Sequence, residues 1–468
     1  MLVRRSVNDS RKTEVKGMFK STRLVILAFA VLTVFALSFA ACGGDEDEDG
    51  DGGGNGGEKT AIPAGPGVGE TVGVTDTSVK IGTLLPMSNT TATAWGVPIS
   101  QGMQAYFDYI NDQGGIYGRK LELVVGDSQY TGPVAGETAK KLTEQDQIFG
   151  FMGNLGTEAE MAVYTYLEEH GVPDMFILTG DKTWVEPVVF SRSRFLVDYE
   201  VEGRILGQYI GENYDGKKLG ILAQNDLFGK DGEAGLKVGL EDVGANVETV
   251  TQYYDATQTD VTAQMQRLKS DGAEVVGVYA MPAQASGAIK AARETLTWDV
   301  PMFLTGVNAA QIVGALAGFA NAEGTISVSF GRQSDEIEFP GVQKYQDIMK
   351  EYAPDAQINS VGFSGYSVAL AMVQVLIQAG PDLTRTSFLN AAESICKYEG
   401  GGTIAPISMS PEDHAWNEAE IFVEAEGDSA DTFRWKPFGD VISQYETTKD
   451  CSPAERPADA DKQPGAQD

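Results

Sequence analysis

GMQAYFDYINDQGGIYGRKLELVVGDSQ, at residues 102–129, joins a helical pattern to a strand. Apolar residues from Met103 to Ile110 recur at spacings of three and four, as on one face of an amphipathic helix, which we expect over residues 100–111. Gly114 and Gly115 end that helix. The run KLELVVGD then predicts a strand at residues 120–127.

The same alternation continues on both sides of this stretch. Further strands are predicted at residues 79–85, 148–152, 175–178, 218–223, 247–254, 274–280, 302–305 and 325–330. Further helices are predicted at residues 134–145, 157–170, 200–214, 230–243, 259–270, 283–295, 309–317, 341–352 and 360–379. Strands and helices that alternate through short connections imply an α/β fold, in which a parallel sheet is covered on both faces. The rhythm restarts after Arg194, so we expect two α/β units of similar plan.

Two such units leave a cleft between them. In open α/β sheets, ligands bind in the loops at the carboxyl ends of the strands. The loops that meet this description are at residues 86–98, 153–157, 179–184, 224–229, 279–282 and 306–308.

The N-terminus reads as an export signal. Residues 24–41 form an uncharged apolar run that follows Lys16, Lys20 and Arg23 and precedes Cys42. Residues 1–41 resemble a bacterial lipoprotein signal peptide, which implies that Cys42 is lipidated. An uncleaved transmembrane anchor is the alternative, and either Met1 or Met18 can be the true start. Residues 42–74 are acidic and rich in glycine, as in a flexible tether.

Composition excludes several classes of function. The chain has 67 Asp plus Glu against 35 Lys plus Arg, a net charge of −32, which argues against nucleic-acid binding. His170 and His414 are its only histidines, so a multi-histidine metal site is impossible. The sequence GFSG at residues 362–365 lacks the spacing of a nucleophile elbow and is expected to open a helix. We therefore expect no enzyme activity, no metal and no cofactor.

Several motifs, taken in order, resemble those of a known family. The stretch quoted first is followed by GNLGTEAE, ILTGDKTW, AQNDLFGKDG, GVYAMPAQASG and APISMSPEDH. This ordered set, within residues 75–440, resembles the type I periplasmic binding proteins of the leucine/isoleucine/valine-binding group, which serve ABC importers. The resemblance implies two lobes, each a mostly parallel sheet flanked by helices, with a ligand cleft between them. Lobe 1 would comprise residues 78–195 plus 326–402, and lobe 2 residues 196–325 plus 403–451. Residues 452–468 read as a disordered tail.

The family resemblance also implies a function. The lobes would close around a small polar solute, such as an amino acid, an amide or a small organic acid, and present it to the permease subunits of an ABC importer. The protein would be a monomer held by its lipid on the outer face of the cell membrane. An extracellular receptor that senses a ligand without an importer is the alternative.

The resemblance is carried over to individual residues. The implied ligand-binding residues are Trp95, Gly156, Thr157, Thr179, Asp181, Thr183, Phe228, Tyr279 and Asn308. Trp95 would cover the ligand side chain, while the Thr157 hydroxyl and the amides at its helix start would receive a carboxylate. Asp181 would either receive an ammonium group or cap a helix.

One departure from the family pattern bears on the ligand. Where amino-acid binders carry an acidic residue for the α-ammonium group, this chain has TGVNAA at residues 305–310. A buried ammonium without a charged partner is costly. Either Asp181 supplies the charge or the ligand is not an α-amino acid.

Two thiols remain if Cys42 is lipidated. In an exported protein such a pair more often forms a disulfide than not, so we expect a bond between Cys396 and Cys451. Two separate free thiols are the alternative.

Overall fold

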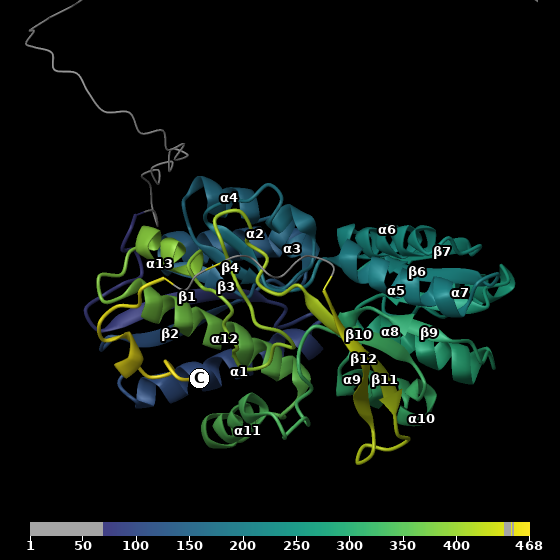
Figure 1. Ribbon diagram of the computed structural model, residues 1–468. Coiled ribbons are helices and arrows are strands. Elements are labelled where there is room, and N and C mark those ends of the chain that lie inside the picture. Colours follow the sequence, from purple (N-terminus) through teal and green to yellow (C-terminus); the bar gives the residue numbers. More distant parts are fainter. Residues whose placement is uncertain (1–68, 444–450, 452–453) are drawn as a thin grey trace, which may run out of the picture. The chain divides into compact units, whose positions relative to one another are not determined.

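The computed structural model describes residues 69–443, 451 and 454–468. The predicted signal peptide, the predicted lipidation site Cys42 and most of the predicted tether lie outside these residues. The α/β class is confirmed, with two sheets and helices on their faces (Figure 1).

The first sheet has five parallel strands in the order β2-β1-β3-β4-β5. They are β1 (Ser78–Leu85), β2 (Lys120–Asp127), β3 (Gly150–Met152), β4 (Asp174–Ile177) and β5 (Arg192–Arg194). The helices α1 (Thr93–Asp112) and α12 (Ser360–Ala379) share one hydrophobic core with this sheet. A separate core on the other face takes in α2 (Gly132–Lys140), α3 (Thr157–Met161) and α4 (Tyr164–Glu169). The helices α11 (Pro340–Tyr352) and α13 (Arg385–Ala392) pack against α1 and α12.

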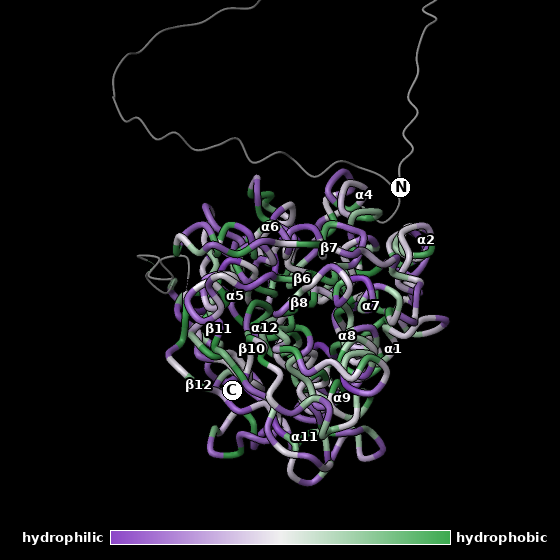
Figure 2. Tube along the Cα trace, turned by 90° about the vertical axis from the view of Figure 1, so that its right-hand side faces the viewer, coloured by the Kyte–Doolittle hydropathy of each residue, from purple (hydrophilic) through white to green (hydrophobic). Residues whose placement is uncertain are grey.

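The second sheet has seven strands in the order β12-β11-β10-β9-β8-β6-β7. They are β6 (Lys218–Gln224), β7 (Glu248–Tyr254), β8 (Val275–Tyr279), β9 (Met302–Leu304), β10 (Ile326–Ser329), β11 (Ala419–Glu426) and β12 (Arg434–Ser443). Strands β6 to β10 are parallel, whereas β11 and β12 are antiparallel to their neighbours. One face carries α5 (Tyr199–Asn213) and α6 (Leu227–Asp242), and the other carries α7 (Thr262–Ser270), α8 (Pro282–Lys290) and α9 (Gln311–Ala317). Figure 2 shows apolar segments at the inner strands β6 and β8 and polar ones at the outer loops.

Shorter elements account for the remaining helical turns of the described residues. They are α10 (Phe319–Ala322), the π-helical turns η1 (Lys141–Gln145) and η3 (Ala291–Thr295), and the 3₁₀ turns η2 (Lys182–Trp184), η4 (Gly306–Asn308) and η5 (Ala460–Lys462). Helix α12 is apolar and long enough to span a membrane, but 89% of its apolar window is buried in the protein, as in a core helix. It contains the GFSG sequence, as predicted.

The predicted lobe boundaries need two corrections. Strand β10 pairs with β9 and β11, so residues 326–329 belong to the second sheet rather than to the first lobe. The prediction places residues 403–451 in the second lobe, yet His414 and Trp416 are bonded to β5 in the first sheet. The Arg194 N–H donates to the His414 carbonyl, and the Trp416 N–H donates to the Arg194 carbonyl. The return to the second sheet comes at β11. We propose the remaining division into two lobes as predicted.

The prediction of a disordered tail is wrong for the described residues 454–468. The Tyr106 hydroxyl donates to Asp468 at 3.0 Å, and the Gln374 amide donates to the Gly465 carbonyl at 2.6 Å. Ala460 is fully buried. The segment is polar and rich in proline, but small residues let it lie closely against α1 and α12. A disulfide joins Cys396 to Cys451 just before it, with a Cα–Cα distance of 5.7 Å.

Candidate functional site

A small chamber lies between the two sheets, and we call it the aromatic chamber. Its walls come from both lobes, at the carboxyl ends of the strands. The lining residues are Trp95, Tyr130, Leu155, Gly156, Thr157, Leu178, Leu196, Tyr199, Phe228, Met281 and Val307. Among the described residues that line it, none carries a charge, and aromatic and aliphatic side chains predominate.

A chain of three hydroxyl groups forms the polar edge of this chamber. The Thr157 and Thr179 hydroxyl oxygens lie 2.5 Å apart, and the Thr179 oxygen lies 3.3 Å from the Tyr199 hydroxyl. Thr157 and Thr179 are buried. Burial raises the pKa of Tyr199, so its hydroxyl stays protonated and can donate. Of these residues Thr157 and Tyr199 line the chamber, while Thr179 supports them from behind.

The loop before Thr157 is fixed by close packing. Gly156 has a φ of +111°, and a Cβ atom there would lie 2.8 Å from the ring of Tyr130. Any other residue would therefore be strained and would clash with the chamber wall. This glycine lets the chain pass close to Tyr130 and places Thr157 at the chamber.

The aromatic wall of the second lobe has two layers. The rings of Phe228 and Tyr199 lie 4.7 Å apart, and Tyr279 lies behind Phe228 at 6.1 Å. Tyr279 is buried, and its pKa is raised by burial and then by Glu202 and Glu420. It was predicted to face the cleft, but it does not line the chamber.

Three other predicted residues also lie outside the chamber. Asp181 accepts a hydrogen bond from the Thr183 N–H at 2.7 Å and so caps η2, and neither residue lines the chamber. The Asn308 amide donates to the Ala280 carbonyl at 2.9 Å, and its buried oxygen has no partner in the described part of the chain. The adjacent Val307 reaches the chamber instead. The contacts of Asp181 support its role as a cap.

Some lining residues were not predicted. Tyr130 follows the carboxyl end of β2 inside the stretch that determined the fold, and its position after a strand was a usable signal. Tyr199 and Leu196 lie where the chain crosses from the first sheet to the second. No local sequence pattern marks such a crossing.

Comparisons with known proteins agree with this geometry. Residues 78–430 match the family model described as periplasmic binding protein. Leu/Ile/Val-binding protein homolog 1 of Brucella abortus (strain 2308) is 22% identical over 198 residues, which are 42% of this chain and 53% of that protein. The chain thus spans about half the length of the first curated relatives it matches. Homolog 7 of the same strain is 21% identical over 318 residues, 64% of this chain and 76% of that protein.

Solved structures share the fold. A branched chain amino acid ABC transporter protein from Thermus thermophilus with bound valine superposes with a TM-score of 0.71 at 18% identity, over 80% of this chain and 98% of that one. A solute binding protein from Rhodopseudomonas palustris BisB5 in complex with 3,4-dihydroxy benzoic acid gives a TM-score of 0.70 at 17% identity, over 80% of this chain and all (100%) of that one.

Two α/β lobes with a chamber between them, at the carboxyl ends of their strands, define a type I binding-protein fold. The chain belongs to the periplasmic binding protein family.

Proposed function

We propose that this chain is an exported, lipid-anchored solute-binding protein. It captures a small solute in the aromatic chamber by closure of its two lobes and delivers it to the permease of an ABC importer. The observation that carries this proposal is the chamber itself, to which Thr157 of the first lobe and Phe228 of the second both contribute. A solute that contacts both walls favours the closed arrangement, because it binds that arrangement more tightly.

The lining of the chamber favours one class of solute over another. An α-ammonium group buried there would meet no carboxylate, since Asp181 is engaged as the cap of η2. A small organic acid or amide with an aliphatic or aromatic body would instead place its polar end on the hydroxyl chain of Thr157, Thr179 and Tyr199. The aromatic acid bound to the Rhodopseudomonas palustris protein is a solute of this kind.

The test is a binding screen followed by a substitution. Purified full-length protein is heated with amino acids, amides and organic acids, and solutes that raise the unfolding temperature are measured by calorimetry. Thr157→Val should weaken the affinity for a bound solute about tenfold, because one buried hydrogen bond is lost. Thr295→Val, at an exposed position, is the matched control. If no solute binds, or if Thr157→Val binds as tightly as the wild type, the proposed site is wrong.

The anchor and the partner need separate experiments. The mass of the mature protein should show a chain that begins at a lipidated Cys42; an unmodified Cys42 within an intact N-terminus would contradict the anchor. Deletion of the protein should abolish cellular uptake of the solute it binds. Unchanged uptake of a tightly bound solute would favour the alternative, a receptor that senses its ligand without an importer.

A further inference from the structure

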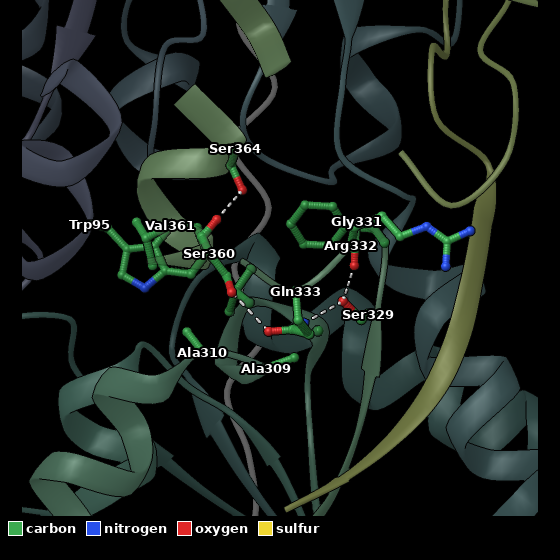
Figure 3. A pocket seen from close by; sticks show the side chains of 13 residues that line it. Trp95, Ala309, Ala310, Ser329, Gly331, Arg332, Gln333, Ser360, Val361 and Ser364 are labelled. Atoms are coloured by element: carbon green, nitrogen blue, oxygen red, sulfur yellow. Dashed lines mark hydrogen bonds between the residues drawn. The ribbon is translucent and has the colours of Figure 1, made fainter. Parts of the chain in front are cut away.

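A second small chamber adjoins the aromatic chamber, and we call it the polar chamber. It lies between the start of α12, the η4 turn and the crossing segment at residues 329–333 (Figure 3). Trp95 and Val307 line both chambers. The two spaces are therefore neighbours that share a wall.

Gln333 gives this chamber an oriented amide group. Its Nε2 atom donates to the Ser329 hydroxyl at 3.1 Å, and its Oε1 atom accepts from the Ser360 hydroxyl at 2.9 Å. Both hydroxyls are themselves held, Ser329 by donating to the Gly331 carbonyl at 2.7 Å and Ser360 by accepting from the Ser334 N–H at 3.1 Å. A primary amide has two donor hydrogens and two acceptor lone pairs, so one of each remains free for a ligand.

Trp95 adds a second donor at the wall between the chambers. Its side chain is only 4% exposed, and its indole nitrogen has no hydrogen-bond partner among the described residues. Leaving a buried N–H group unpaired costs about 1–3 kcal/mol. Figure 3 shows this nitrogen at the edge of the ring toward Ala310, on the side of the polar chamber. A ligand oxygen placed there would satisfy it.

The polar groups near Trp95 in this chamber are uncharged. Arg332 is the charged residue among those that line it, but its guanidinium lies over the ring of Phe339 at 3.6 Å and is 3.9 Å from Glu336. In Figure 3 the guanidinium extends away from Trp95. The free groups near Trp95 are thus neutral hydrogen-bonding groups.

We propose that the two chambers form one elongated site divided by Trp95. The solute then has a polar group at each end of an apolar body. One end contacts the hydroxyl chain of Thr157, and the other, a neutral oxygen function such as a hydroxyl, a carbonyl or a carboxamide, binds Gln333 and the Trp95 indole. This inference rests on the proposed function and names the class of solute that the site takes.

The test uses pairs of solutes of similar size that differ at one end. Full-length protein is screened with 4-carbamoylbenzoate against 4-methylbenzoate and with 6-hydroxyhexanoate against hexanoate. We expect the solutes with two polar ends to bind about five- to tenfold more tightly than their partners, since each adds a hydrogen bond inside the polar chamber.

Two variants locate the effect. Gln333→Met keeps the length of the side chain but removes the amide, and Trp95→Phe keeps an aromatic ring but removes the N–H. Each should abolish the preference for the second polar end, and Gln333→Met should also leave the affinity for 4-methylbenzoate or hexanoate within about twofold. Gln311→Met, at an exposed position of α9, is the matched control and should keep the preference.

The outcomes separate this inference from the function on which it rests. Binding of the singly polar solutes with equal or greater affinity, or a preference that both variants retain, overturns the elongated site but leaves solute capture intact. If no solute of any class binds in either screen, the proposed function fails with it. Thermal unfolding of each variant shows that it is folded, and a preference lost in either folded variant alone supports the proposal.

Discussion

Two carboxyl groups are buried beneath the η4 turn in the second lobe. Glu202 accepts a hydrogen bond from the Gly306 N–H at 2.9 Å and is 3% exposed. Glu420 is fully buried, and neither of its carboxyl oxygens has a hydrogen-bond partner in the described part of the chain. The pKa of Glu420 is raised well above its ordinary value, first by burial and then by Glu202. The pair therefore holds a proton at a pH where exposed glutamates have lost theirs.

Glu420→Gln should flatten the pH dependence of stability. Because the folded state raises the pKa of Glu420, it binds a proton that the unfolded state releases above the ordinary pKa of 4.5. Wild-type stability should then decline as pH rises above that value, by up to about 1.4 kcal/mol per pH unit until the folded-state pKa is passed. Thermal unfolding between about pH 5 and pH 8 measures this. Glu424→Gln, on the same strand but partly exposed, is the control; identical slopes in wild type and Glu420→Gln would contradict the account.

At the scale of single residues, the sequence could identify side chains that belong to a recognisable motif. Trp95, Gly156, Thr157 and Phe228, which the family resemblance marks as ligand-binding residues, all line the aromatic chamber, and their contact with a solute stays a prediction. Tyr279 was misplaced because the end of a strand can direct a side chain to either face of the sheet, and only the packed structure shows which. The polar chamber could not be found, since Gln333 and Ser360 meet only in the folded chain.

At the scale of elements, the close contact between α1 and α12 depends on glycines in both helices. A Cβ atom on Gly365 would lie 2.1 Å from the Ile99 carbonyl oxygen, and one on Gly102 would lie 2.0 Å from the Gly362 carbonyl oxygen. Backbone atoms cannot move aside as a flexible side chain can. These glycines therefore set how closely the two helices approach and hold Trp95, near the start of α1, in place.

Gly365→Ala should destabilise the protein by about 2 kcal/mol or more, because the helices must separate to admit a methyl group. Gly136→Ala is the matched control in α2, where the nearest atom to the new methyl group would be 3.8 Å away. There alanine should be neutral or stabilising by up to about 1 kcal/mol, as expected from helix propensity. The test compares the unfolding temperatures of the two variants with that of the wild type. Equal changes at both sites would refute the close-packing argument.

Periodicity was sufficient to predict most elements and insufficient for a few. Every strand from β1 to β10 was predicted except β5. Its three residues are RSR, and they form no apolar run. The prediction began the first helix after Pro98, whereas α1 starts at Thr93 and contains that proline. The antiparallel pair β11 and β12 was missed because no helix follows either strand to continue the alternation.

At the scale of the whole molecule, an acidic residue of the first lobe acts electrostatically on an acidic residue of the second. Asp231 lies on α6 in the second lobe, and its pKa is raised to about 7, first by burial and then by Asp181 of the first lobe. Asp198 raises this pKa further, while Lys182 lowers it. Bringing the lobes together therefore favours a protonated Asp231.

Ligand affinity should accordingly fall as pH rises. Because Asp181 belongs to the other lobe, closure contributes part of the rise in the pKa of Asp231 to about 7, and closing therefore takes up part of a proton near that pH. Affinity at about pH 8 should be roughly three- to tenfold weaker than at about pH 6, the lower figure allowing for solvent screening of a partly exposed group. Calorimetry on wild type and Asp231→Asn measures this, with Asp271→Asn as control. An Asp231→Asn variant with the wild-type pH profile would contradict the coupling.

Both ends of the described chain lie on the first lobe. Near one end the Glu70 carbonyl accepts from the Arg385 N–H at 2.8 Å, and at the other Asp468 is bonded to Tyr106 at 3.0 Å. A mechanical load applied through either end would thus be borne by one lobe and would not pull the chamber open. If the protein is fixed to a bead or an electrode by a terminal tag, the second lobe remains free to move. Its movement on closure would then signal that a solute has bound.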